Sequence, residues 1–131
     1  MEKMEAQLAS ILINTYNRDS ALRGQAEEAL KLFLSSPGSL SALITLVSNQ
    51  NQSVPRELRQ ATGIVLKNRL RDYWTDEGKG LPSTEQEKEY LKIVLVESLL
   101  VETDKSLRGI IAESIRITSE FEFPDRFASI I

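Results

Sequence analysis

The 131-residue chain contains no cysteine and no histidine. Without cysteine, disulfide bonds, thiolate metal sites and thiol nucleophiles are excluded, and without histidine the usual general base near neutral pH is missing. Together the two absences exclude Ser-His-Asp and Cys-His catalysis and nearly all zinc sites. A carboxylate enzyme is compatible with the composition, but no residue pattern points to one. We therefore expect a protein that is not an enzyme and that carries no cofactor or metal.

Long hydrophobic runs are also missing. The best apolar run, at 93–101, is interrupted by Glu97, and the N-terminus carries acids where a signal peptide has a basic start. With 41% hydrophobic and 27% charged residues, the chain is long enough for one domain with a core. We expect no membrane insertion and a location in the cytoplasm or the nucleus.

Basic charge is scarce overall but locally concentrated. The chain has 16 Lys and Arg against 19 Asp and Glu, a net charge of −3. The segment 56–71 alone holds five basic residues and one acid, a net charge of +4, so the remainder carries −7. Because the total charge is negative, direct binding of nucleic acid through net charge is not expected.

Three segments of the chain begin with Leu-Arg and can be aligned: LRGQAEEAL at 22–30, LRQATGIVL at 58–66 and LRGIIAESI at 107–115. The first, fifth and ninth positions of each segment lie on one face of a helix. In all three segments the ninth position is a large aliphatic residue: Leu30, Leu66 and Ile115. The pattern predicts three amphipathic helices in a common register.

A partner helix is predicted before each of these three, and the middle partner is expected to begin with Ser36 as its cap and Pro37 in its first turn. The repeats are offset by 36 and 49 residues, which bracket the roughly 40 to 47 residues of a HEAT or armadillo unit. We therefore predict an all-α protein, an α-solenoid of HEAT-type antiparallel helix pairs. The expected pairs are 5–15 with 19–34, 37–50 with 54–73, and 84–101 with 105–121. A closed helical bundle is the alternative.

The last residues, FEFPDRFASII, predict the start of a fourth pair from Pro124. A solenoid normally finishes with a polar capping repeat, so we expect this chain to be a fragment of a longer one. An uncovered apolar end tends to associate. Self-association is therefore expected through the aromatic and aliphatic residues of this end: Phe121, Phe123, Phe127, Ile130 and Ile131.

Four polar residues of the second Leu-Arg segment fall opposite its apolar arc on a helical wheel and include no acid. We call them the basic stripe: Arg56, Gln60, Lys67 and Arg71. The tenth position of the register is basic in every repeat, and stacking predicts that these three side chains align in a ladder: Lys31, Lys67 and Arg116. The alternative is a set of solvated side chains near helix C-termini, where the helix dipole favours cations.

Parts of the sequence resemble a known family, the N-terminal domain of the importin-beta (karyopherin-beta) nuclear transport receptors. They are QAEEALKLF at 25–33, LRQATGIVLKNRLRDYW at 58–74 and FPDRF at 123–127. The resemblance covers nearly the whole chain, as one domain over 1–131. Its most specific part is a set of five residues: Leu66, Lys67, Asn68, Leu70 and Trp74. The loop at 74–88 and the FPDR sequence resemble most the branch that includes the exporter of importin alpha and the larger importins.

The resemblance implies a HEAT solenoid, with repeats at about 5–34, 37–73 and 84–121 and a partial fourth from 124. It also implies binding of the small GTPase Ran in its GTP state on the concave face, where the second helix of each pair lies. The matching residues are the basic stripe together with Lys31 and Arg116. Cargo and nucleoporins would bind later repeats, and the receptor would occupy cytoplasm, nucleus and nuclear pore.

A second class of function is a helical-repeat adaptor or scaffold that binds a peptide or protein partner unrelated to Ran. A membrane adaptor would carry clustered Lys and Arg with exposed aromatics. The basic stripe is sparser than that, and the rest of the chain is acidic. Retention on GTP-loaded Ran, but not on GDP-loaded Ran or anionic liposomes, distinguishes the two classes.

Overall fold

The computed structural model describes residues 3–49, 54–75 and 85–130, with side chains for all of these except 72–75, 85 and 120–130. The described residues form helices and no strand, so the predicted all-α class is confirmed. The helices are α1 (Lys3–Asn14), α2 (Ser20–Leu34), α3 (Ser39–Ser48), α4 (Arg56–Thr75), α5 (Glu85–Val101) and α6 (Lys105–Ile130).

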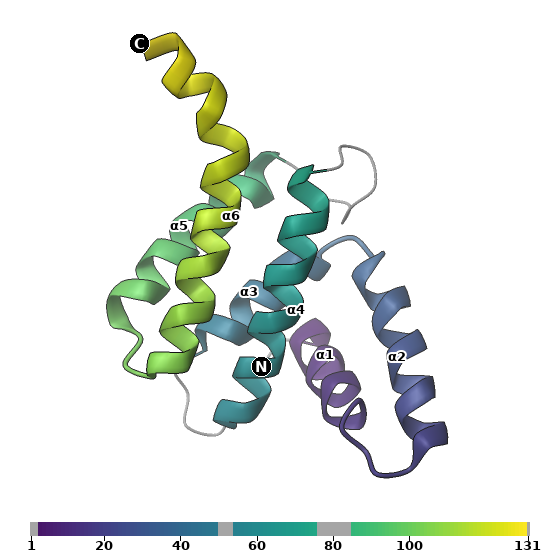
Figure 1. Cartoon of the computed structure of the whole chain (residues 1–131). Coiled ribbons are helices and arrows are strands. Elements are labelled where there is room, and N and C mark those ends of the chain that lie inside the picture. Colours follow the sequence, from purple (N-terminus) through teal and green to yellow (C-terminus); the bar gives the residue numbers. More distant parts are fainter. Residues whose placement is uncertain (1–2, 50–53, 76–84, 131) are drawn as a thin grey trace.

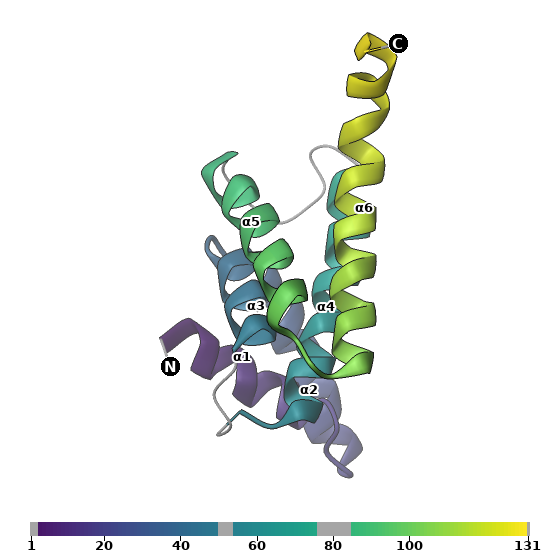
Figure 2. The ribbon, with the colours of Figure 1, turned by 90° about the vertical axis from the view of Figure 1, so that its left-hand side faces the viewer.

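Consecutive helices pack as pairs, α1 with α2, α3 with α4, and α5 with α6. The first helices of the pairs contact one another in order, α1 on α3 and α3 on α5, and form one layer. In the second layer α4 and α6 run parallel and side by side, which both views show (Figures 1 and 2). These contacts make a helical-repeat fold in which each pair packs on the next.

The core is centred on α3, which contacts α1, α2, α4 and α5. Seven of its ten residues are buried, and Leu43, Ile44 and Leu46 have no exposed surface. A helix that is apolar on nearly all sides must be covered on all sides, which explains why the other elements gather around it. In the described part of the chain no single helix is long and apolar enough to cross a membrane. Only α2 and α3 taken together, bent by 112°, meet that length and composition.

The start of α3 differs from the prediction. The helix begins at Ser39, after Gly38 with φ of 86°, and not at Ser36 and Pro37. The Ser36 hydroxyl instead donates to the Leu32 carbonyl at the end of α2, 3.1 Å away. Ser36 therefore ends one helix instead of opening the next, and the left-handed turn falls on the glycine, which tolerates it.

The α2 helix departs from the common register. The register predicts α2 beside α4, as α4 lies beside α6, but among the described helices α2 contacts only α1 and α3. Its buried residues Ala26, Phe33 and Leu34 hold it there, while Leu22 at its start is 44% exposed. The equivalent Leu58 and Leu107 are buried. The common register therefore does not extend to the burial of Leu22.

An apolar groove of about 500 Å³ remains between the end of α1 and the first half of α4. Gly63 faces α6, whereas Ala61 and Ile64 line the groove on another side of the same helix. The groove also contains Tyr16 from the α1–α2 connection and Gln60 of the basic stripe. The side of α4 that lines the groove is thus mainly apolar.

The chain continues as helix beyond the third pair. α6 runs through Pro124 to Ile130, so the separate helix predicted from Pro124 is not observed. A proline removes one backbone hydrogen bond and tends to kink or break a helix, but here it does not end the helix. α6 extends past the other helices at its C-terminal end (Figure 2). The side chains of 120–131 lie outside the described residues, so self-association through them stays a prediction.

Close packing of α4 on α6 depends on Gly63. A Cβ atom placed there would lie 2.8 Å from the Cγ2 methyl of Ile110, while Gly24 and Gly109 have nothing within 4 Å. The Ile110 methyl belongs to a β-branched side chain with restricted χ1, so it cannot easily move aside. The two other glycines therefore serve as matched controls within helices.

We predict that Gly24→Ala and Gly109→Ala each raise the free energy of unfolding by about 0.5–1 kcal/mol, through helix propensity alone. The free energy of unfolding of Gly63→Ala should lie about 1–3 kcal/mol below that of the two controls, because the new methyl overpacks the α4–α6 contact. Urea unfolding followed by circular dichroism measures all three. Equal stabilisation by the three substitutions would contradict the close packing.

Candidate functional site

The site is built where the first turn of α4 meets the first turn of α6. The Pro55 carbonyl accepts the first helical hydrogen bonds of α4, from the backbone N–H groups of Leu58 and Arg59 at 3.1 Å. Across from it, Asp104 caps α6 by accepting from the Leu107 N–H at 3.0 Å. A carboxylate at this position satisfies a free N–H group and is favoured by the helix dipole. Two helix starts from neighbouring repeats therefore lie together.

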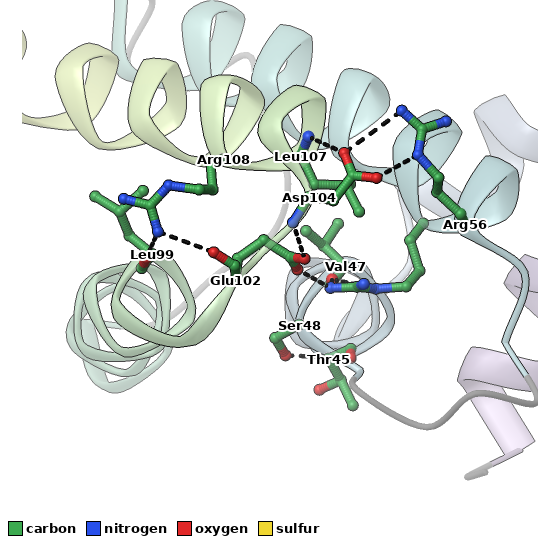
Figure 3. Close-up of polar contacts among 10 residues, drawn as sticks. Thr45, Val47, Ser48, Arg56, Leu99, Glu102, Asp104, Leu107 and Arg108 are labelled. Carbon is green, nitrogen blue, oxygen red and sulfur yellow. Dashed lines mark hydrogen bonds and ion pairs between the residues drawn. The ribbon is translucent and has the colours of Figure 1, made fainter.

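Arg56 joins the two starts. Its guanidinium forms an ion pair with the Asp104 carboxylate (Figure 3). It also donates to the side-chain oxygen of Gln60 at 2.9 Å, so it connects two residues of different repeats. The hydrogen bond from Arg56, aided by the one from the Leu107 N–H, lowers the pKa of Asp104. The hydrogen bond to Asp104 in turn raises the pKa of Arg56. Both groups are thus charged at neutral pH.

A buried ion pair fixes the turn that carries Asp104. Arg59 of α4 pairs with Glu102, and their side chains are only 10% and 3% exposed. Arg59 also donates twice to the Val47 carbonyl at the end of α3, at 2.8 and 3.0 Å. The second oxygen of Glu102 accepts from the Asp104 N–H at 3.1 Å. The pair therefore connects α3, α4 and the α5–α6 turn.

Arg108 completes the turn from the other side. Its Nη1 atom donates to the carbonyls of Leu99 and Glu102 at 2.6 and 2.9 Å, near the end of α5 (Figure 3). Carbonyls at a helix end lack partners inside the helix, and a cationic side chain there also suits the dipole. The α5–α6 turn is thus held by an arginine on each side.

Three cations gather around one carboxylate further along α4 and α6. Arg116 donates to both oxygens of Glu113, at 2.5 and 3.0 Å, and Arg71 of α4 lies 3.9 Å from the same carboxylate. Lys67 is close enough to act on it electrostatically. The pKa of Glu113 is lowered mainly by the hydrogen bond from Arg116. The charges of Arg116, Arg71 and Lys67 lower it further. A carboxylate with a lowered pKa stabilises the fold at pH values above its ordinary pKa. This stabilisation is lost as the pH falls through the lowered pKa of the folded state.

The structure brings together most of the sequence-predicted site residues. The basic stripe lies along α4 on the side next to α6, and Arg116 of α6 adjoins its end at Glu113. Lys31 does not join them, because α2 does not contact α4. Its side chain is 76% exposed and pairs with Glu28 of its own helix. The predicted ladder therefore holds for Lys67 and Arg116 but is wrong for Lys31.

Four charged residues of the site and its support were not predicted: Arg59, Glu102, Asp104 and Glu113. Arg59 directly follows Leu58 of the Leu-Arg register, so it lies next to the apolar face of its helix. Its partner stands 43 residues away, and no local pattern connects the two. Asp104 caps α6 and Glu113 lies within it, and their contacts with α4 depend on how the two helices are placed in space.

The described residues contain no group of three or more His, Cys, Asp or Glu side chains that could hold a metal ion. The arrangement consists instead of paired cations and carboxylates on the outer side of two parallel helices. Arg71 and Arg116 are each more than half exposed. Chemically, the site can exchange an internal carboxylate for an external one.

Comparison with known proteins identifies a family. A family model described as the importin-beta N-terminal domain matches residues 26–101, more than half of the chain. The match begins within α2 and ends with α5, so it includes the whole basic stripe. No curated protein matches the chain significantly.

We predict that Arg59→Met lowers the free energy of unfolding by about 3–5 kcal/mol, because it leaves the Glu102 carboxylate buried without its partner. Replacing both residues, Arg59→Met with Glu102→Leu, should cost much less than the two single changes added together, because no charge stays buried. Urea unfolding of the wild type, of Arg59→Met, of Glu102→Leu and of the double variant gives the coupling free energy between the two residues.

The pair of Glu89 and Lys92 is the matched control, because its charged atoms are 3.2 Å apart and its side chains are 65% and 27% exposed. Lys92→Met should cost no more than about 1 kcal/mol. A loss at Arg59 as small as the one at Lys92 would show that the buried pair does not hold the turn.

Proposed function

The chain belongs to the importin-beta family of nuclear transport receptors, and on that premise we propose that its α4–α6 face binds the small GTPase Ran in its GTP state. Binding there regulates the capture and release of cargo. The face comprises the basic stripe with Arg116 of α6. The family is one of transport receptors and not of enzymes.

One observation supports this proposal most strongly. Cations from two successive repeats converge on the exposed side of the second helices, with Arg71 of α4 and Arg116 of α6 both near the Oε1 atom of Glu113. A surface shared by two repeats is specific to the stacked solenoid, since neither helix alone presents it. Single exposed cations would be ordinary, but a set ordered by the repeat suits a protein partner.

The charge of the face defines the chemistry of the partner. Exposed guanidinium groups recognise carboxylates in a planar, two-bond geometry, so the matching surface carries acidic side chains. The rest of the chain is acidic, and this contrast directs an acidic partner surface to the basic face. Lys31 contributes at most through long-range attraction, because α2 lies apart from the face.

Finer assignments follow from the sequence resemblance. We place the chain in the branch of the importin-alpha exporter and the larger importins, on the strength of the 74–88 loop and the FPDR sequence. Receptors of the family shuttle between nucleus and cytoplasm. We propose the same distribution for this chain, including the nuclear pore, with cargo and nucleoporins bound by further repeats.

We predict that Lys67→Glu with Arg71→Glu weakens binding to GTP-loaded Ran by at least about tenfold, because each reversal replaces attraction by repulsion at the centre of the face. Surface plasmon resonance at two salt concentrations measures the change. Slower, salt-sensitive association would place these residues at the rim of the interface, and faster dissociation would place them at its centre.

Lys88→Glu with Lys92→Glu is the matched control, since it reverses two charges with the same spacing on α5 of the other layer. It should leave binding within about twofold. Circular dichroism checks that both variants are folded. Equal retention on GDP-loaded Ran, or unchanged affinity of the folded Lys67 and Arg71 variant, would refute the proposal and favour a helical-repeat adaptor with another partner.

A further inference from the structure

The carboxylate of Glu113 lies at the centre of the proposed binding face, where it is an unexpected charge. It pairs with Arg116 on its own helix and approaches Arg71 of the neighbouring helix to 3.9 Å. About a third of the side chain is exposed. An incoming acidic side chain would thus meet a like charge among the cations that attract it.

The repeat shows how this arrangement arises. The first and third Leu-Arg helices each carry a glutamate three residues before the cation of the ladder, Glu28 before Lys31 and Glu113 before Arg116, and both form ion pairs within their helix. The second helix has Ile64 at this position, before Lys67. Glu113 therefore neutralises cations of two repeats at once.

We propose that Glu113 is an internal competitor, which occupies the place of a partner carboxylate and is displaced when the acidic surface of the GTPase binds. The inference rests on the proposed function and adds its regulation. Exposed ion pairs contribute little to folding, so exchange of one carboxylate for another costs little. The internal charge keeps the affinity of the face low and makes association slower than the cations alone would allow.

Asp104 has a different role, although it also pairs with a stripe residue. Its carboxylate caps α6 through the Leu107 N–H, and its own N–H is held by Glu102. Displacing it would leave the start of α6 without its cap. Asp104 therefore positions Arg56, whereas Glu113, inside the helix and away from its ends, is not needed as a cap.

The test is Glu113→Gln, which keeps the size of the side chain and removes its charge. We expect binding to GTP-loaded Ran to tighten by about threefold or more at low salt, mainly through faster association, and the gain to shrink at high salt. Glu89→Gln is the matched control, because Glu89 also pairs with a cation three residues later, on α5. Its effect should be within measurement error.

A second pair of variants tests the same inference from the opposite side. Ile64→Glu gives Lys67 a glutamate three residues before it, as Lys31 and Arg116 have. Ile64→Gln makes the same loss of apolar surface without charge. Ile64→Glu should bind about threefold more weakly than Ile64→Gln, mainly through slower association at low salt. Thermal unfolding by circular dichroism verifies that all variants are folded.

The outcomes separate the inference from the proposed function. If Lys67→Glu with Arg71→Glu weakens binding while Glu113→Gln leaves it unchanged or weaker, the α4–α6 face does bind the GTPase, but the competitor role of Glu113 is overturned. If neither change affects binding, the proposed function itself fails. Tighter binding by Glu113→Gln together with weaker binding by Ile64→Glu supports the competitor role.

Discussion

The buried pair of Arg59 and Glu102 is the interaction on which the arrangement of the site depends. Burying two charges carries a desolvation penalty that only excellent geometry and further hydrogen bonds can offset. Here the Val47 carbonyl and the Asp104 N–H supply those bonds, so both side chains are satisfied within the protein. The pair contributes specificity of arrangement, because it fixes the α5–α6 turn against the end of α3 and against α4.

The position of that turn determines the charge pattern on the surface. It places Asp104 at the start of α6, where the same carboxylate caps the helix and holds Arg56. With the starts of α4 and α6 aligned, close contact at Gly63 keeps the two helices parallel over the following turns. Lys67 and Arg71 then come within the field of Glu113. A chain with an excess of acids thus presents one ordered group of cations.

Much of the fold was predictable because it depends on local periodicity. The second helix of each pair and the parallel contact of α4 with α6 follow from the Leu-Arg register, and the partner helices follow from patterns of their own. The structure confirms the helices and their pairing. The outward direction of the basic stripe also follows, since it lies opposite the apolar arc. The register failed for α2 because Phe33 and Leu34 hold that helix against α1 and α3, a tertiary preference with no local signal.

The charges that organise the site were less predictable. Arg59 and Glu102 are 43 residues apart in sequence, and Glu102 lies in the turn between α5 and α6, so no local pattern joins them. Glu113 stands three residues before Arg116, a spacing at which side chains on a helix meet, but its approach to Arg71 of α4 depends on the distance between the two helices. The start of α3 was misplaced because a serine followed by proline opens helices often, whereas here the backbone turns at Gly38.

The most direct measurement of the central claim is nuclear magnetic resonance of the isotopically labelled chain, titrated with Ran in its two nucleotide states. We predict that GTP-loaded Ran shifts the amide signals of 56–71 in α4 and 104–116 in α6, with smaller changes in α2 and α5, and that GDP-loaded Ran shifts few signals. Shifts concentrated in α1, α3 and α5, or equal shifts with both nucleotide states, would contradict the claim that the α4–α6 face is the GTPase-binding surface.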